Sequence, residues 1–141
     1  MSFKPKEKVV VPIDFSESSA AAVREGLRCA ASASGVHVVH VAYGLQPVAP
    51  YGYFHFEEPD AQKYLDDFIS KNHLQGVTPV VLCGDAGTEI TRYAEEQNAD
   101  LIVIPSHGYH GMNRWLLGST AERVIRHAHC PVYVLRRRDA E

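Results

Sequence analysis

Two runs of apolar, mostly β-branched residues, Val9–Ile13 and Val36–Ala42, constrain the fold of this chain more than any other feature. A strand with one wet face alternates apolar and polar residues, whereas these runs are apolar almost throughout. Continuous apolar strands are typical of parallel sheets that are covered by helices on both faces. We therefore expect residues 9–13 to form a central buried strand and residues 36–42 to form a second one.

Segments with the apolar spacing of helices lie between the expected strands. The first helix is expected to follow Ser16, which occupies an N-cap position, and to stop near Gly35. Three more helices are expected at 60–74, at 88–97 with Thr88 as the cap, and from Gly118 onward. Further strands are expected at 77–83, 100–104 and 131–136, the first of them at a sheet edge because Pro79 cannot donate a ladder hydrogen bond.

Five strands that alternate with four helices predict a doubly wound α/β fold. Neither an internal repeat nor a domain linker interrupts this order, so we expect one domain over residues 1–141. Its sheet should be five-stranded and parallel, with right-handed crossovers and helices on both faces. Ligands of such sheets bind outside the carboxyl ends of the strands, where the strand order reverses. This rule brings together Pro12-Ile13-Asp14, Val41-Ala42 and Pro105-Ser106-His107-Gly108.

Composition and charge narrow the possible partners. The chain has 141 residues, of which 45% are hydrophobic, which is enough for a sizeable core. A formal net charge of −3 gives no reason to expect a nucleic-acid or membrane partner, and no apolar run approaches the ~20 residues of a membrane span. Three separated cysteines in apolar company (Cys29, Cys83 and Cys130) favour reduced core thiols and hence a cytoplasmic protein.

Two histidines interrupt the second strand. His37 and His40 are three residues apart, so their side chains should point to opposite faces of the sheet. This geometry argues against a shared metal ion and favours ordinary hydrogen-bonded histidines.

The segment from Val103 to Arg126 has the sequence of a strand, a glycine-bearing loop and a helix start. The first turn of a helix has backbone N–H groups without intrahelical partners, and the helix dipole adds about half a positive charge there. Gly118 allows close approach of an anion, while the hydroxyls of Ser119 and Thr120 can donate to phosphate oxygens or cap the helix. The segment is therefore a candidate anion-binding site.

The same segment resembles the universal stress protein family of the ATP-binding type. The pattern of that family is Gly, two residues, Gly, nine residues, Gly, then Ser or Thr, and it falls here on Pro105, Gly108, Gly118 and Ser119. Proline replaces the first glycine and removes one backbone donor, and Gly111 in the loop does not restore it at the required spacing. The resemblance continues through Pro-Ile-Asp at 12–14, His-Val on the second strand and Cys-Pro-Val-Tyr-Val-Leu before Arg136. It implies the strand order 3-2-1-4-5.

The resemblance also implies roles for individual residues. Pro12, Ile13 and Asp14 correspond to the adenosine and ribose end of the site, where the Asp14 carboxylate could accept from a ribose hydroxyl or reach Mg or Mn on the phosphates. The backbone of Val41 corresponds to the adenine edge. Two backbone arms around the phosphates correspond to Pro105, Ser106, His107, Gly108, Tyr109 and Gly111, and to Gly118, Ser119, Thr120 and Ala121. The alternatives are that Asp14 only caps the first helix, that Val41 is only core, and that Gly118-Ser119 is only a helix cap.

The function that the resemblance implies is a cytoplasmic, ATP-binding stress-response or regulatory protein with at most slow hydrolysis. The family generally dimerises, and the last strand, Val132 to Leu135, is the expected homodimer interface. One alternative is a nucleotide-free interaction module, favoured by Pro105 and by the aromatic connection within 44–59, which is either a flap or a partner surface. The other is an adenine-nucleotide hydrolase, favoured by Asp14, His107 and His110. The sequence lacks the phosphate-loop and dinucleotide-binding motifs.

Overall fold

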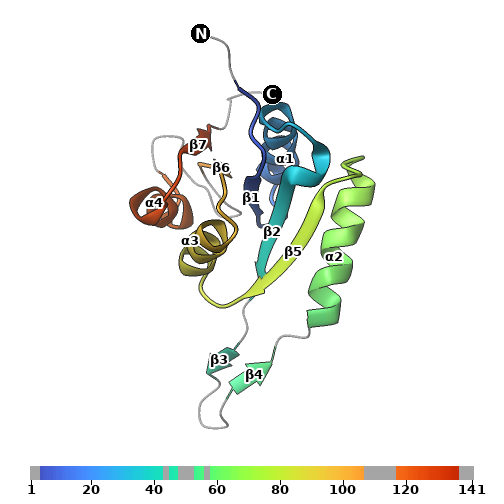
Figure 1. Cartoon of the computed structure of the whole chain (residues 1–141). Coiled ribbons are helices and arrows are strands. Elements are labelled where there is room, and N and C mark those ends of the chain that lie inside the picture. The colour runs from blue at the N-terminus through green and yellow to red at the C-terminus, as the bar shows by residue number, and fades with distance from the viewer. Residues whose placement is uncertain (1–3, 43–44, 48–52, 56–57, 107–116, 137–141) are drawn as a thin grey trace.

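One parallel sheet organises the structure, a computed structural model that describes residues 4–42, 45–47, 53–55, 58–106 and 117–136. Its strands run in the order β5-β2-β1-β6-β7, and all neighbours are parallel (Figure 1). The strands are β1 (Val9–Ile13), β2 (Val36–Ala42), β5 (Thr78–Cys83), β6 (Leu101–Pro105) and β7 (Val132–Leu135). Numbered along the chain, these five strands have the order 3-2-1-4-5, which confirms the predicted doubly wound α/β fold.

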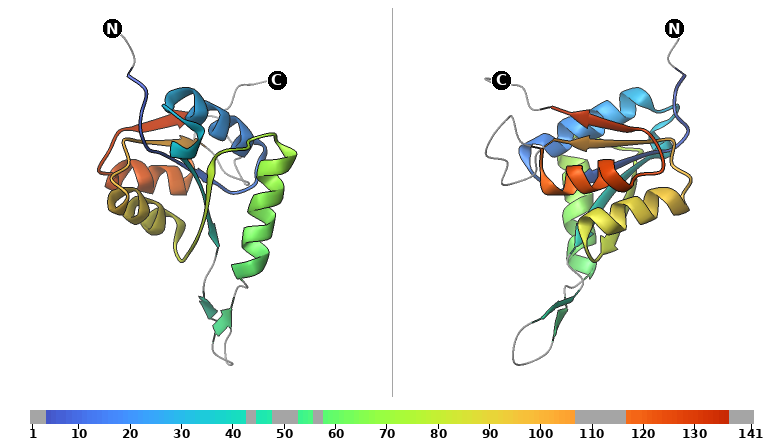
Figure 2. Two further views of the ribbon diagram at one scale, coloured as in Figure 1. Left: turned by 45° about the vertical axis from the view of Figure 1, so that its right-hand side comes forward. Right: turned by 90° about the vertical axis from the view of Figure 1, so that its left-hand side faces the viewer.

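Four helices cover the two faces of this sheet (Figure 2). Helices α1 (Glu17–Cys29) and α2 (Glu58–Lys71) lie on one face, and α3 (Ala86–Glu96) and α4 (Ser119–His127) lie on the other. All five residues of β1 are buried: Val9 and Val11 join the core beneath α1 and α2, whereas Val10 joins the core beneath α3 and α4. This double coverage is the reason that β1 has no polar residue.

The boundaries of α1, α2 and α3 differ from those predicted, and α2 spans Glu58–Lys71 rather than 60–74. Helix α1 ends at Cys29 rather than near Gly35, because Lys6 donates to the Cys29 carbonyl and accepts from the Ala31 N–H, which draws the chain into an extended path. Helix α3 begins two residues before Thr88, since the carboxylate of Asp85 accepts from the Thr88 N–H and is the N-cap.

The expectation of three core cysteines was wrong at one position. Cys29 is buried and Cys130 is half-buried, but Cys83 at the end of β5 is exposed. The strand β5 lies at the sheet edge, as Pro79 predicted, and an edge strand is covered less than a central one.

The connection after β2 contains a hairpin that the sequence analysis did not predict. Strands β3 (Leu45–Pro47) and β4 (Tyr53–His55) pair with each other in antiparallel register and form a separate two-stranded sheet. The hairpin projects from the end of β2, away from the helices (Figures 1 and 2). Strand signals were weak here because each strand has only three residues and one of them contains proline.

Close packing of α1 on the sheet makes Gly26→Ala a test of the core. A Cβ atom at residue 26 would lie 2.6 Å from Cγ2 of Val11, well inside contact distance. Alanine gains about 1 kcal/mol of helix propensity, whereas overpacking costs about 1–3 kcal/mol. We expect a net loss of unfolding free energy in urea denaturation. In a Val11→Ala background the same change should be neutral or stabilising. An equal loss of unfolding free energy in that background would show that the clash is not with Val11.

Candidate functional site

The carboxyl end of β1 lies at the point where the strand order reverses. Residues of β1 and β6 are in register only at Val9–Leu101 and Val10–Ile102, although β1 continues to Ile13 and β6 to Pro105. The two strands therefore part toward their carboxyl ends. Because ligands of doubly wound sheets bind at such a reversal, this is the candidate site.

Strand β2 extends past the end of β1 on the other side of the site. The β1–β2 ladder ends at the pair Ile13–His40, whereas β2 continues beside β5 to Ala42. The edge of Val41 that faces β1 thus lies beyond the last paired residue of β1. The side chain of Val41 is half-buried and packs on the core beneath α3 and α4. Val41 is therefore a core residue through its side chain, while its backbone remains a candidate ligand contact.

The turn from β1 into α1 presents the polar groups nearest to this edge. Asp14 is exposed, and its Oδ1 accepts from the Ser16 N–H at 3.0 Å and from the Ser19 hydroxyl at 3.2 Å. These two bonds hold the turn that precedes α1, whose N-cap residue is Ser16. They do not exclude a ligand role for Asp14, because a carboxylate has two oxygens with about four acceptor positions.

Ser16 is a candidate ligand contact that the sequence analysis assigned only to capping. It is the N-cap of α1, but its side chain makes no capping hydrogen bond. Its Oγ is buried and is without a hydrogen-bond partner among the described residues. A buried hydroxyl without a partner is uncommon and calls for a ligand or a water. The signal in the sequence was its position two residues after Asp14, which also suits an ordinary cap.

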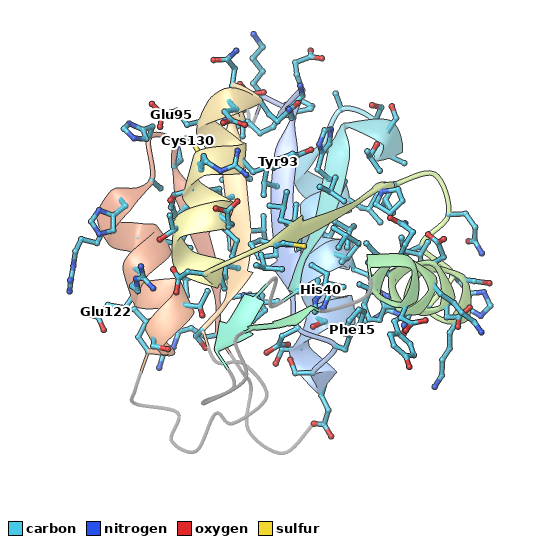
Figure 3. All side chains as sticks on the ribbon, turned by 90° about the horizontal axis from the view of Figure 1, so that it is seen from below. Phe15, His40, Tyr93, Glu95, Glu122 and Cys130 are labelled. Carbon is cyan, nitrogen blue, oxygen red and sulfur yellow. The ribbon has the colours of Figure 1, made fainter. Side chains whose placement is uncertain are left out.

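Two histidines of β2 point to opposite faces, as predicted, and both are hydrogen-bonded. His37 Nδ1 lies 2.6 Å from the hydroxyl of Tyr93 on α3, and His40 Nδ1 lies 3.2 Å from the Ile13 carbonyl. Burial lowers the pKa of both imidazoles, and for His40 the hydrogen bond to Ile13 and the charge of Asp14 partly oppose this effect. His40 lies next to Phe15 of the β1–α1 turn (Figure 3).

The start of α4 adjoins the end of β6. The Gly118 N–H donates to the Ser106 carbonyl at 2.6 Å, and the Ser106 N–H donates to the Leu135 carbonyl on β7 at 2.9 Å. Gly118, not Ser119 or Thr120, is the N-cap, and no side chain in the described part of the chain caps the helix. The N–H groups of the first helical turn, Ser119 to Ala121, consequently have no intrahelical acceptor.

The neighbouring helix α3, unlike α4, has a charged side chain as its N-cap. Asp85 caps it, and Arg123 on α4 contacts the same carboxylate at 2.7 Å and the Thr88 hydroxyl at 3.1 Å. Hydrogen bonds from Arg123 and from Thr88 lower the pKa of Asp85 from 3.8 to about 2. A carboxylate thus already occupies the start of α3, whereas a glycine stands at the start of α4. Of the two helices on this face, α4 is the one whose N-terminus suits an anion.

The structure brings together most of the predicted site residues for which it gives positions. Pro12 and Ile13 are buried at the end of β1, and Pro105 and Ser106 lie at the end of β6, with Ser106 only 7% exposed. Ala121 is buried on α4, and Ser119 is exposed. His107, Gly108, Tyr109 and Gly111 lie outside the described residues, as does His110.

The described residues contain neither a membrane-spanning helix nor a cluster of metal ligands. None of their helices is long and apolar enough to cross a membrane. Histidine, cysteine, aspartate and glutamate side chains form no group of three or more that could hold a metal ion in these parts of the chain.

A reversal of strand order beside a helix that starts at a glycine N-cap defines a doubly wound α/β protein with a candidate ligand site at the carboxyl edge of its sheet. A sequence model of the Universal stress protein family matches residues 6–136. A universal stress protein of Methanocaldococcus jannaschii is 32% identical over 145 aligned residues, which cover 93% of this chain and 82% of the relative. The chain therefore belongs to the universal stress protein family.

Solved structures share the fold. A universal stress protein from Archaeoglobus fulgidus in complex with dAMP superposes with a TM-score of 0.63 at 24% identity, over 92% of this chain and 98% of the other. A universal stress protein in complex with cAMP superposes with a TM-score of 0.64 at 22% identity, over 94% of this chain and 98% of the other. Some members of this fold thus bind adenine nucleotides.

The contact of Asp85 with Arg123 predicts how stability depends on pH. The folded chain holds the Asp85 carboxyl charged down to about pH 2, whereas the unfolded chain takes up a proton near its ordinary pKa of 3.8. This stabilisation should be complete above about pH 4 and should be lost as the pH falls through 2. Because Asp85 is more than half exposed, Asp85→Ala should cost only about 1 kcal/mol at pH 7, mostly as a lost cap.

Asp85→Asn is the matched control, since asparagine also caps helices but cannot pair with Arg123 as an ion. Thermal melts from pH 2 to 7 should place it between wild type and Asp85→Ala. Equal melting temperatures of all three proteins at pH 7 would show that neither the cap nor the ion pair contributes.

Proposed function

We propose that this protein binds ATP, with Mg or Mn on its phosphates, at the carboxyl edge between β1, β2, β6 and the start of α4. The start of α4 is the observation that carries the proposal, because a glycine cap leaves three backbone N–H groups and the positive end of the helix dipole for an anion. The buried Oγ of Ser16, which has no hydrogen-bond partner among the described residues, supplies an additional polar group on the β1 side. The nucleotide complexes of two family members support the same ligand class.

Each part of the nucleotide has candidate contacts in this arrangement. The free edge of Val41 suits the polar edge of adenine, and Pro12 and Ile13 form an apolar wall beside it. Asp14, at the exposed turn, would accept from a ribose hydroxyl or hold the metal ion. Ser119, Thr120 and Ala121 would donate to phosphate oxygens from one side. We propose that the segment with Pro105, Ser106, His107, Gly108, Tyr109 and Gly111 lies on the other side of the phosphates.

The proposed role is that of a stress-response or regulatory protein in the cytoplasm, which acts through nucleotide occupancy with at most slow hydrolysis. A hydrolase would need a base that can take a proton from water. The Oδ1 atom of Asp14 already accepts two hydrogen bonds within the turn, which favours binding over turnover.

A second candidate is a nucleotide-free interaction module of the same fold. It is favoured by the backbone of the β6 exit: Pro105 has no N–H, and the N–H groups of Ser106 and Gly118 already donate to carbonyls. Three potential phosphate donors are therefore unavailable there. Direct measurement of nucleotide binding separates the two candidates.

ATP with magnesium should stabilise the protein against heat. A ligand at a hundred times its dissociation constant adds about 2.7 kcal/mol, because it binds the folded chain only. For a domain of this size this corresponds to several degrees in differential scanning fluorimetry. The absence of any shift or calorimetric signal at millimolar adenine nucleotide would favour the interaction module.

Gly118→Val tests the place of the phosphates. Gly118 has φ −61° and ψ 151°, a conformation that valine also adopts, so the variant should fold. The added methyl groups should block approach to the first turn of α4 and abolish ATP binding in calorimetry. Ser119→Ala should weaken binding only about 2- to 10-fold, the effect of one hydrogen bond. If the folded Gly118→Val protein binds ATP with unaltered affinity, the phosphates do not bind at the start of α4.

We also propose a homodimer through the outer edge of β7. The Pro131 and Leu135 carbonyls accept from β6, and bonding residues alternate along a parallel strand, so the backbone of Val132 and Val134 faces outward. An apolar edge of this kind invites pairing with a second copy. The side chain of Val134 packs on the core beneath α4, so a backbone change tests the edge better than a charged side chain would.

Val134→Pro should convert the dimer to a monomer in light scattering, because it removes an outward N–H and leaves the β6 ladder intact. Val134→Ala is the control, since it trims the side chain and keeps the donor. A dimer mass that persists in Val134→Pro would move the interface away from β7.

A further inference from the structure

The turn between β1 and α1 has a strained backbone. Phe15 has φ 63°, in the left-handed region, which bulky side chains rarely adopt. Such a conformation persists only where the surrounding structure determines it, and it is found most often at functional sites. The neighbours of Phe15 are therefore the groups that hold this turn.

His40 touches the turn at two points. Its ring lies 4.4 Å from the ring of Phe15, and Figure 3 shows the two side chains next to each other. Its Nδ1 lies 3.2 Å from the Ile13 carbonyl, and because a carbonyl only accepts, Nδ1 carries the proton and donates. Phe68 of α2 supports Phe15 from another side, edge-on at 5.7 Å.

The turn determines where two candidate ligand groups point. Asp14 and Ser16 flank Phe15, and the Ser16 N–H donates to Asp14 Oδ1 across it. A change of Phe15 to an ordinary φ would redirect the chain between them and so reorient both the carboxylate and the buried Ser16 hydroxyl.

We propose that His40 is a positioning residue of the nucleotide site, which fixes Asp14 and Ser16 by donating to Ile13 and by packing on Phe15. This inference rests on the proposed function. His40 touches the turn, and acts on the ligand only through it. Its imidazole has two functions: Nδ1 donates to the Ile13 carbonyl at the end of β1, and the ring packs against the ring of Phe15.

His37 offers a matched control on the same strand. It also makes one hydrogen bond through Nδ1, to Tyr93, and it also packs beside an aromatic ring, at 5.9 Å. It lies on the opposite face, away from the turn. Loss of either imidazole should destabilise the chain, but only the loss of His40 should disturb the site.

The experiment compares His40→Phe, His40→Asn and His37→Phe in the whole chain. Phenylalanine keeps a ring against Phe15 and removes the donor, whereas asparagine keeps a donor near the Nδ1 position and removes the ring. Calorimetry with ATP and magnesium measures affinity, and amide NMR with hydrogen exchange reports on Phe15 and Ser16.

We expect His40→Phe to weaken ATP binding about tenfold and to shift the Phe15 and Ser16 amides. His40→Asn should recover part of the affinity. His37→Phe should lower the melting temperature and leave both readouts unchanged. Equal loss of affinity in His37→Phe, or unchanged affinity and amides in folded His40→Phe, would overturn the proposal.

The amide readout does not depend on the ligand. If the wild-type chain binds no ATP, the proposed function fails and with it the nucleotide role of His40. Shifted amides in His40→Phe alone would still show that His40 holds the turn, so the two failures are distinguishable.

Discussion

Burial of β1 on both faces is the constraint on which the rest of the structure depends. All five residues are buried, with Val9, Val11 and Ile13 in the core beneath α1 and α2 and Val10 in the core beneath α3 and α4, so the chain must supply a helical layer on each side. The crossovers then run in opposite directions from β1, and the strand order reverses beside it. The candidate site is a consequence of that reversal, since no strand continues the ladder past Val10 on the β6 side.

The site combines a rigid part with a strained part. On the β6 side, hydrogen bonds from Gly118 to Ser106 and from Ser106 to Leu135 tie the strand end, the helix start and the edge strand together. On the β1 side, Phe15 has a left-handed backbone conformation, and its ring contacts the rings of His40 and Phe68. Strain near a site is consistent with a turn selected for where it points its side chains rather than for stability.

The N-termini of α3 and α4 differ in their N-cap residue, and this residue decides whether the helix start already carries a negative charge. Asp85 places a negative charge at the start of α3 and recruits Arg123, whereas Gly118 places no side chain at the start of α4. The dipole of α3 is therefore already satisfied within the chain.

The sequence alone determined the fold class, the edge position of β5 and the opposite orientations of His37 and His40, because periodicity and the missing proline donor act locally. It also placed Asp14, Val41 and Gly118 at one edge of the sheet, since parallel strands share their carboxyl ends. Only the tertiary structure decided that α1 ends at Cys29, that Asp85 rather than Thr88 caps α3, and that Ser16 has a buried hydroxyl without a partner among the described residues. Each of these depends on a neighbour or on burial that no local pattern encodes, as does the contact of His40 with the strained turn at Phe15.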